Sequence, residues 1–146
     1  MRVVADTNVA VSGLLWHGPP NQLLRWCRDG FLQILACEAT TAELSRVLQY
    51  KRFAKRLSTL GRSPYETLAY YMNLVLFVPT PENIARIIID DPFDNVFLAL
   101  ACDHKAHLIV SGDVHLLSLK EHSGIQIVTP GEACEVIQEL FGLNGN

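Results

Sequence analysis

The stretch Arg2-Val3-Val4-Ala5-Asp6-Thr7-Asn8-Val9 decides how this chain folds, because a short apolar run ends at an acid and then takes on a helical pattern. The run 2–5 is typical of a buried strand, and we expect a helix over about 8–15. A second apolar run, 107–112, ends in the same way at Asp113. We therefore predict strands that pass directly into helices, with an acid at each junction.

Segments typical of strands alternate with segments typical of helices along the whole chain. Besides 2–5, the expected strands are 31–36, 74–78, 108–110 and 125–128. Besides 8–15, the expected helices are about 20–30, a segment that carries Glu43, the stretch that follows it, 64–73, 81–89, 93–105, 114–119 and 130–142. This order predicts a three-layer α/β/α fold with a central, mainly parallel five-stranded sheet. We expect one domain over 1–141 and a short flexible tail over 142–146.

Composition and length limit the kind of protein. A chain of 146 residues with 49% hydrophobic residues is long enough to bury one core and is not disordered. No apolar stretch approaches the roughly 18 residues that span a bilayer. The N-terminal apolar run resembles the start of a signal peptide, but Asp6 and Asn8 interrupt it. We expect a cytoplasmic protein with no membrane contact, and reduced thiols at its four scattered cysteines.

Four acids are candidates for a metal site: Asp6, Glu43, Asp94 and Asp113. Parallel strands place their carboxyl ends at one edge of a sheet, so Asp6 and Asp113 can be neighbours despite their separation in sequence. Carboxylates gathered in one crevice repel each other unless a cation neutralises them. Each acid also has a local alternative, since Asp favours helix N-caps and Thr40-x-x-Glu43 fits a capping box. Taken together, the acids predict a divalent metal site.

Positive charge is concentrated directly after Glu43, although the net charge is −3. Between Leu44 and Tyr65 there is no acid, and six of the twelve basic residues fall there. Such a face can attract a nucleic acid to a protein that is acidic overall. We predict RNA binding at Arg46, Lys51, Arg52, Lys55 and Arg56. The alternative is a solvated helical face with no ligand.

Four short motifs follow one another along the chain: Asp6-Thr7-Asn8-Val9, Ala42-Glu43-Leu44, Asp91-Pro92-Phe93-Asp94-Asn95 and Ser111-Gly112-Asp113. Together they resemble the motifs of PIN-domain nucleases, over about 2–140. The most similar subgroup is the toxin-like VapC type of toxin–antitoxin systems. The resemblance implies a Mg²⁺- or Mn²⁺-dependent endoribonuclease in which the four candidate acids hold the metal. It further implies that Asn8, Asn95 and Ser111 orient ligands or waters, that an antitoxin protein binds the chain, and that the chain forms a homodimer.

Three positions depart from the pattern of that family. Asp90 stands where a basic residue often precedes Asp91, Phe93 replaces a polar residue, and His115 lies where an acid is frequent. Three alternatives remain at this point. A phosphatase or dehalogenase could use Asp6 as nucleophile, although its motif needs an acid where Asn8 stands. A PIN-like or receiver-like domain could bind metal or a partner without cleavage. A nuclease of this fold could act on DNA.

Overall fold

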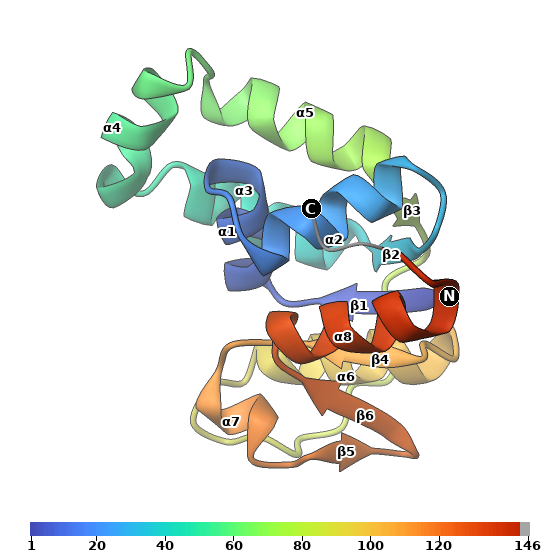
Figure 1. Ribbon diagram of the computed structural model, residues 1–146. Coiled ribbons are helices and arrows are strands. Elements are labelled where there is room, and N and C mark those ends of the chain that lie inside the picture. Colours follow the sequence, from blue (N-terminus) through green and yellow to red (C-terminus); the bar gives the residue numbers. More distant parts are fainter. Residues whose placement is uncertain (144–146) are drawn as a thin grey trace.

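A six-stranded sheet runs through the molecule, and the structure, a computed structural model, describes residues 1–143 (Figure 1). Its strands are β1 (Arg2–Ala5), β2 (Gln33–Ala36), β3 (Leu76–Phe77), β4 (Leu108–Val110), β5 (Glu121–His122) and β6 (Ile125–Val128). Its helices are α1 (Thr7–Leu15), α2 (Pro19–Arg28), α3 (Glu38–Leu48), α4 (Lys51–Thr59), α5 (Pro64–Leu74), α6 (Asp94–Asp103), α7 (Val114–Leu117) and α8 (Pro130–Phe141). Of the predicted tail, 144–146 lie outside the described residues.

The strand order is β3-β2-β1-β4-β6-β5, and every pair is parallel except β5 with β6. The mainly parallel α/β sheet is therefore confirmed, but the prediction of five strands was wrong by one. The missed strand, β5, has only two residues, too few for an alternating pattern. The turn that follows it uses Ser123 and Gly124, both at positive φ, as a tight two-residue hairpin requires.

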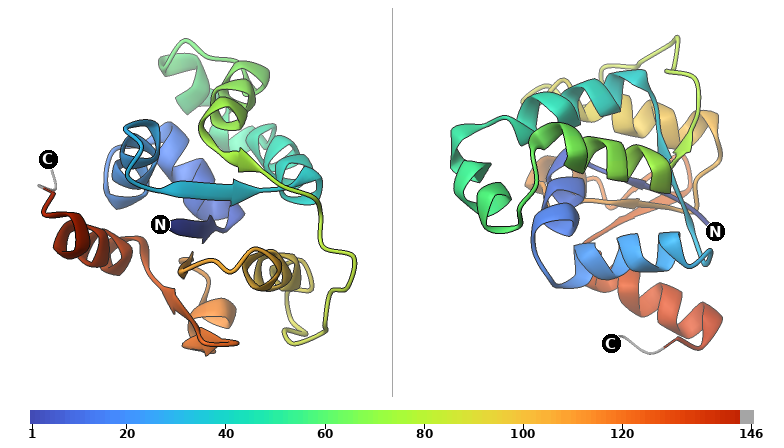
Figure 2. Two further views of the ribbon diagram at one scale, coloured as in Figure 1. Left: turned by 90° about the vertical axis from the view of Figure 1, so that its right-hand side faces the viewer. Right: turned by 90° about the horizontal axis from the view of Figure 1, so that it is seen from above.

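Helices cover both faces of the sheet, as the two views in Figure 2 show. Neighbouring residues of a strand point to opposite faces, so Val3 packs with α1, α2 and α8, whereas Val4 packs with α6 and α7. Helices α3 and α5 extend the first of these two cores. Both Val3 and Val4 are buried, which explains the continuous apolar runs of the central strands.

Two local predictions were wrong. Residues 81–89 form no helix, because isoleucine is stiff in helices and because the side chain of Asn95 holds the backbone amides of Ile87 and Ile88. The helix carrying Glu43 begins at Glu38 rather than at a Thr40 cap. The hydroxyl of Thr40 instead accepts from the backbone N–H of Cys37 at 2.9 Å, which leaves the Glu43 carboxylate out of any capping box.

Helix α4 is tied to the C-terminal end of α1 by two arginines. Arg56 Nε donates to the carbonyl of Leu15 at 2.7 Å, and Arg62 Nη1 donates to the carbonyl of Leu14 at 3.2 Å. The last carbonyls of a helix lack partners within the helix, so these bonds satisfy groups that would otherwise need water.

Among the described residues, no helix has both the length and the apolar character needed to cross a bilayer. All four cysteines are free thiols, as predicted.

Candidate metal centre

The parallel pairing of β1 with β4 brings the first and last motifs together. Ala5 stands opposite Val110, and the backbone N–H of Asp6 donates to the Val110 carbonyl at 3.1 Å. Asp6 is then the N-cap of α1, and Asp113 is the N-cap of α7. Capping and clustering are thus compatible, since one sheet edge starts both helices. The predicted proximity of these two acids follows from the strand register.

The hydroxyl of Ser111 connects Asp6 with the loop that carries Asp113. It donates to Asp6 Oδ2 in a short hydrogen bond and accepts from the backbone N–H of Asp113 at 2.9 Å. The other carboxylate oxygen of Asp6 accepts from Val9 N at 2.9 Å. Asp6 is only 3% exposed, so these bonds fix its carboxylate in one orientation.

Three carboxylates stand close enough to share one cation. One oxygen each from Asp91, Asp94 and Asp113 lies within 4.8 Å of the others. Asp91 was not among the predicted ligands, because Asp94 was the only candidate acid of the motif Asp91-Pro92-Phe93-Asp94-Asn95. A sequence signal did exist: Asp91 and Asp94 are three residues apart at a helix start, a spacing that places two side chains on one side.

Asn95 fixes the loop that carries Asp91. Its carbonyl oxygen accepts from the backbone N–H groups of Ile87 and Ile88, and its amide donates to the carbonyls of Ile88 and Pro92. The Asn95 amide is therefore fully occupied by the backbone. It positions Asp91 through the loop, and a role in orienting waters remains a prediction.

The electrostatics of the cluster favour a bound cation. Burial, together with the charges of Asp91, Asp113 and Asp6, raises the pKa of Asp94 from 3.8 to about 7. Burial likewise raises the pKa of Asp6, against the opposing effect of its hydrogen bonds. Asp94 is 5% exposed, and its Oδ2 has no hydrogen-bond partner. A buried, unpartnered carboxylate oxygen beside two further carboxylates fits a hard divalent ion such as Mg²⁺ or Mn²⁺, which prefers oxygen ligands.

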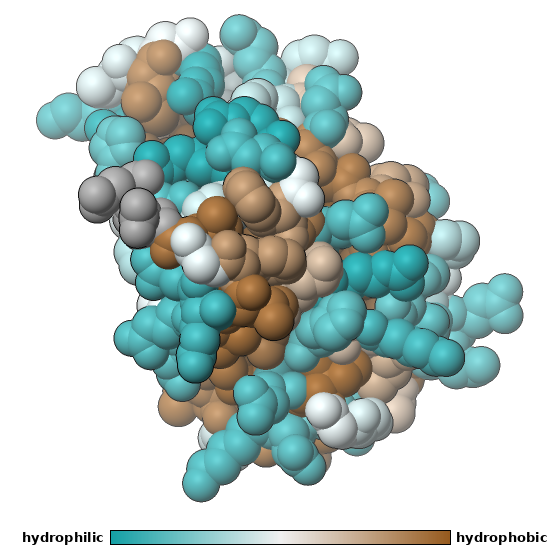
Figure 3. Space-filling model, turned by 45° about the vertical axis from the view of Figure 1, so that its right-hand side comes forward, coloured by the Kyte–Doolittle hydropathy of each residue, from teal (hydrophilic) through white to brown (hydrophobic). Residues whose placement is uncertain are grey.

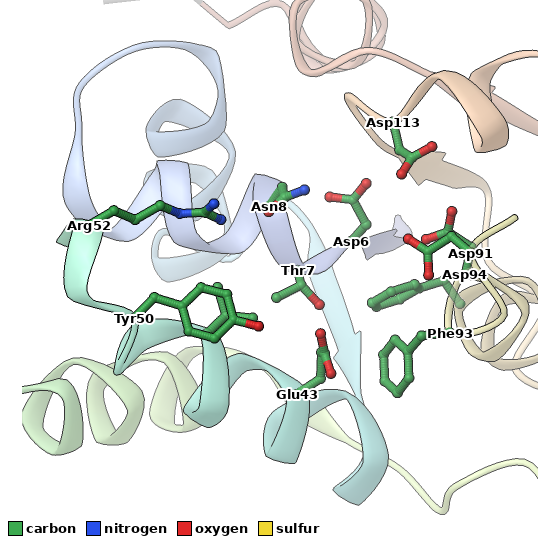
Figure 4. Close-up of a pocket in the computed structure, with 12 residues that line it drawn as sticks. Asp6, Thr7, Asn8, Glu43, Tyr50, Arg52, Asp91, Phe93, Asp94 and Asp113 are labelled. Carbon is green, nitrogen blue, oxygen red and sulfur yellow. The ribbon is translucent and has the colours of Figure 1, made fainter.

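Glu43 lines the same pocket from helix α3, on the far side of Thr7 (Figure 4). Its two carboxylate oxygens accept from Arg46 Nη2 at 2.7 and 2.8 Å. Arg46 therefore neutralises Glu43, and Glu43 lies outside the 4.8 Å cluster. The four predicted acids thus line one pocket, of which only Asp94 and Asp113 share the cluster of three.

We call Asp6, Asp91, Asp94 and Asp113 the acidic wall, and Glu43, Val47, Tyr50 and Arg52 the α3–α4 wall. Both walls line one pocket of about 160 Å³. A single buried water needs roughly 10–15 Å³, so the pocket has room for a hydrated cation. Asn8 and Thr7 lie between the walls (Figure 4), and the Thr7 hydroxyl is buried without a partner.

The five residues predicted to bind RNA lie in different surroundings. Arg46 pairs with Glu43, and Arg56 donates to the α1 carbonyl and lies over the Trp16 ring. Lys51 and Lys55 are exposed on α4 and do not line the pocket, whereas Arg52 does. RNA binding by this group remains a prediction.

Comparison with known proteins shows which family this chain belongs to. The chain is similar in fold to VapBC2 from Rickettsia felis, a complex bound to a promoter DNA fragment, with 14% identity, a TM-score of 0.58, and 87% of this chain and 97% of that chain covered. It is also similar to FitAcB from Neisseria gonorrhoeae, with 18% identity, a TM-score of 0.54, and 88% and 98% covered. No curated protein is significantly similar to this sequence. Residues 2–115 match the model of the PIN domain, and the chain therefore belongs to the PIN-domain family.

Proposed function

We propose that this protein is a Mg²⁺- or Mn²⁺-dependent endoribonuclease that hydrolyses RNA phosphodiester bonds. The observation that carries the proposal is the cluster of Asp91, Asp94 and Asp113, with its buried and unpartnered Asp94 oxygen. Membership of the PIN-domain family supports it. Five acids line the pocket, so a phosphodiester would be repelled from it in the absence of a cation.

The residues of the site would have different roles. Asp94, Asp113 and Asp91 would hold the ion, with Asp6 and Glu43 as further ligands, directly or through water. Ser111 keeps the Asp6 carboxylate and the Asp113 backbone in register, and Asn95 keeps the Asp91 loop in place. Asn8 lines the pocket and can orient a water. The chemistry that a bound divalent ion supplies is activation of the attacking water and neutralisation of charge on the phosphate.

Cleavage of labelled RNA with Mg²⁺ or Mn²⁺ tests this proposal. We expect wild-type protein to cleave and EDTA to abolish cleavage. Asp94→Asn and Asp6→Asn should each lower the rate by on the order of 10³, since each removes several kcal/mol of charge stabilisation. Asp103→Asn is a matched control, because Asp103 is exposed at the far end of α6 and does not line the pocket. Equal, EDTA-insensitive cleavage by all four proteins would contradict the proposal. Cleavage of DNA alone would change the substrate class.

We further propose that the chain is the toxin of a toxin–antitoxin pair and acts in the cytoplasm. The fold similarity to the VapBC2 and FitAcB complexes supports this role. Expression of the wild type should arrest growth, and expression of Asp94→Asn should not. Co-expression of the product of a small neighbouring gene should restore growth and co-purify with the chain. Normal growth with active wild-type nuclease would rule out a toxin.

A homodimer is the proposed assembly of the chain without antitoxin. Apolar side chains form a band on the face shown in Figure 3. The large apolar side chains that are exposed to solvent include Tyr65, Tyr70, Met72 and Phe77. Sedimentation should give about twice the chain mass of 16.3 kDa. A single species at the mass of one chain, across the micromolar range, would contradict a stable dimer.

A further inference from the structure

The pocket has two unlike ends. The acidic wall lies at one end, and Arg52 reaches the other end from the first turn of α4. In Figure 4 the Arg52 guanidinium points toward Asn8, on the side of the pocket away from Asp91 and Asp94. A ligand that fills this pocket therefore meets carboxylates at one end and a guanidinium at the other.

The guanidinium of Arg52 is held in place but is not neutralised. Its central carbon lies 5.3 Å from the ring centroid of Tyr50 and 4.8 Å from that of Phe53. No carboxylate and no hydrogen-bond acceptor among residues 1–143 pairs with it, in contrast to Arg46, which pairs with Glu43. Stacking on aromatic rings restricts the plane of a guanidinium and leaves its N–H donors at the edge available.

The position of Arg52 is unfavourable for the helix that carries it. Lys51 and Arg52 occupy the first turn of α4, which contains no acid. Cations near a helix N-terminus oppose the helix dipole. The charge of Arg52 therefore serves neither the helix dipole nor an ion pair, and an anionic ligand in the pocket would give it a partner.

We infer that Arg52 forms a phosphate subsite, which binds a phosphodiester of single-stranded RNA next to the one held at the acidic wall. The inference rests on the proposed function for the identity of the ligand. A planar guanidinium suits a phosphate because it can donate two parallel hydrogen bonds to it. The proposed function also favours RNA over an acidic peptide as the ligand.

Tyr50 is a positioning residue for Arg52. Its ring faces Arg52, and its hydroxyl accepts a short hydrogen bond from Arg46, which in turn is held by Glu43. Glu43 and Tyr50 both line the pocket. A continuous series of side chains thus links the Arg52 guanidinium to Glu43 along the α3–α4 wall.

Equilibrium binding of a short labelled single-stranded RNA, measured by fluorescence anisotropy with Ca²⁺ in place of Mg²⁺, tests the subsite with a hard cation present at the acidic wall. A gel of the same samples checks that the RNA stays intact during the measurement. Arg52→Gln should weaken binding about tenfold or more, as expected for loss of a charged hydrogen bond. In Arg52→Gln the slope of the logarithm of the binding constant against the logarithm of the salt concentration should be shallower by about 0.7, the value for one phosphate contact to a single strand. Lys105→Gln removes the same charge from an exposed site just beyond the far end of α6, outside the pocket, and should weaken binding about twofold at most. Equal losses in the two variants would overturn the inference.

Two further variants test the geometry. Arg52→Lys keeps the charge but lacks the planar donors. Relative to Arg52→Gln, it should recover less than half of the lost binding free energy. Full recovery would overturn a stacked guanidinium subsite. Tyr50→Leu should weaken binding in the wild-type background and have little effect in Arg52→Gln. A loss from Tyr50→Leu that is equal in both backgrounds would overturn the positioning role.

The subsite and the proposed function can fail separately. If wild-type protein cleaves RNA with Mg²⁺ but Arg52→Gln binds RNA like Lys105→Gln, the subsite is wrong and the nuclease stands. If wild type cleaves nothing but Arg52→Gln loses RNA binding selectively, the nuclease is wrong and the phosphate subsite stands.

Discussion

The acidic wall and the α3–α4 wall face each other across one pocket, but they are built differently. Asp6 and Asp94 are almost fully buried, and Asp6 is hydrogen-bonded to Ser111 and to the backbone of Val9. Arg52 is exposed on a helix outside the sheet, and the contacts found for its guanidinium are aromatic rings. The acids thus start from the end of a strand or the first residue of a helix inside the fold, whereas Arg52 depends on side-chain contacts at the surface.

The largest expected difference between the walls is the stability cost of Asp94. Its pKa rises from 3.8 in the unfolded chain to about 7 in the fold, so the neutral form is favoured when folded. The contribution of Asp94 to stability is therefore highest below pH 3.8 and is lost as the pH rises through 7. The loss without metal is on the order of 4 kcal/mol.

Urea unfolding in EDTA measures this cost directly. Asp94→Asn should be more stable than wild type at pH 8 and nearly equal to it at pH 4, and Mg²⁺ should narrow the gap at pH 8. Asp103→Asn, on the exposed end of the same helix, serves as the control. A difference in unfolding free energy between Asp94→Asn and wild type that does not change with pH would show that burial does not raise the pKa of Asp94.

A second prediction concerns the loop of the acidic wall. Asn95→Ala removes four hydrogen bonds and leaves the buried backbone N–H of Ile88 without a partner. We expect a loss of about 2–4 kcal/mol in urea unfolding. Faster hydrogen exchange at the amides of Ile87 and Ile88 should accompany it. Asn83→Ala, exposed in the same segment, should change neither quantity.

A third prediction tests the link between Asp6 and Asp113. Ser111→Ala removes the donor to Asp6 and the acceptor of the Asp113 N–H. We expect a loss of about 1–3 kcal/mol in unfolding free energy and weaker Mn²⁺ binding by calorimetry. Ser118→Ala, on an exposed residue just beyond α7, should leave Mn²⁺ affinity unaltered. Unchanged Mn²⁺ affinity in Ser111→Ala would mean that Asp6 and Asp113 do not act together.

The smallest effect is expected on the α3–α4 wall. Arg46→Gln breaks an exposed ion pair with Glu43, and such pairs contribute little to stability. The melting temperature should hardly move. Mn²⁺ should bind slightly more tightly, because the Arg46 guanidinium no longer offsets the negative charge of Glu43 in the pocket. Weaker Mn²⁺ binding would mean that Arg46 holds Glu43 in its binding position.

The same contrast explains what could be predicted from the sequence. The proximity of Asp6 and Asp113 followed from two apolar runs in a parallel sheet, since backbone pairing needs no knowledge of side-chain conformation. The place of Asp91 in the cluster was not predicted, because Asp94 was the only candidate acid of its motif. The pairing of Glu43 with Arg46 depends on side-chain conformations, which a pattern of residue types does not specify. β5 was missed because two polar residues carry no periodicity.

Helix α1 is connected at its first residue to the acidic wall and at its last residues to the segment that carries Arg52. Its first turn is capped by Asp6, and its last carbonyls accept from Arg56 and Arg62, which tie down the helix that bears Arg52. Nine residues of helix span about 13 Å, and this length separates Asp6 from the point where α4 is tied to α1. A one-residue insertion in α1 would shift one end by about 1.5 Å and turn it by about 100°, so the length of this helix is as much a part of the site as any carboxylate.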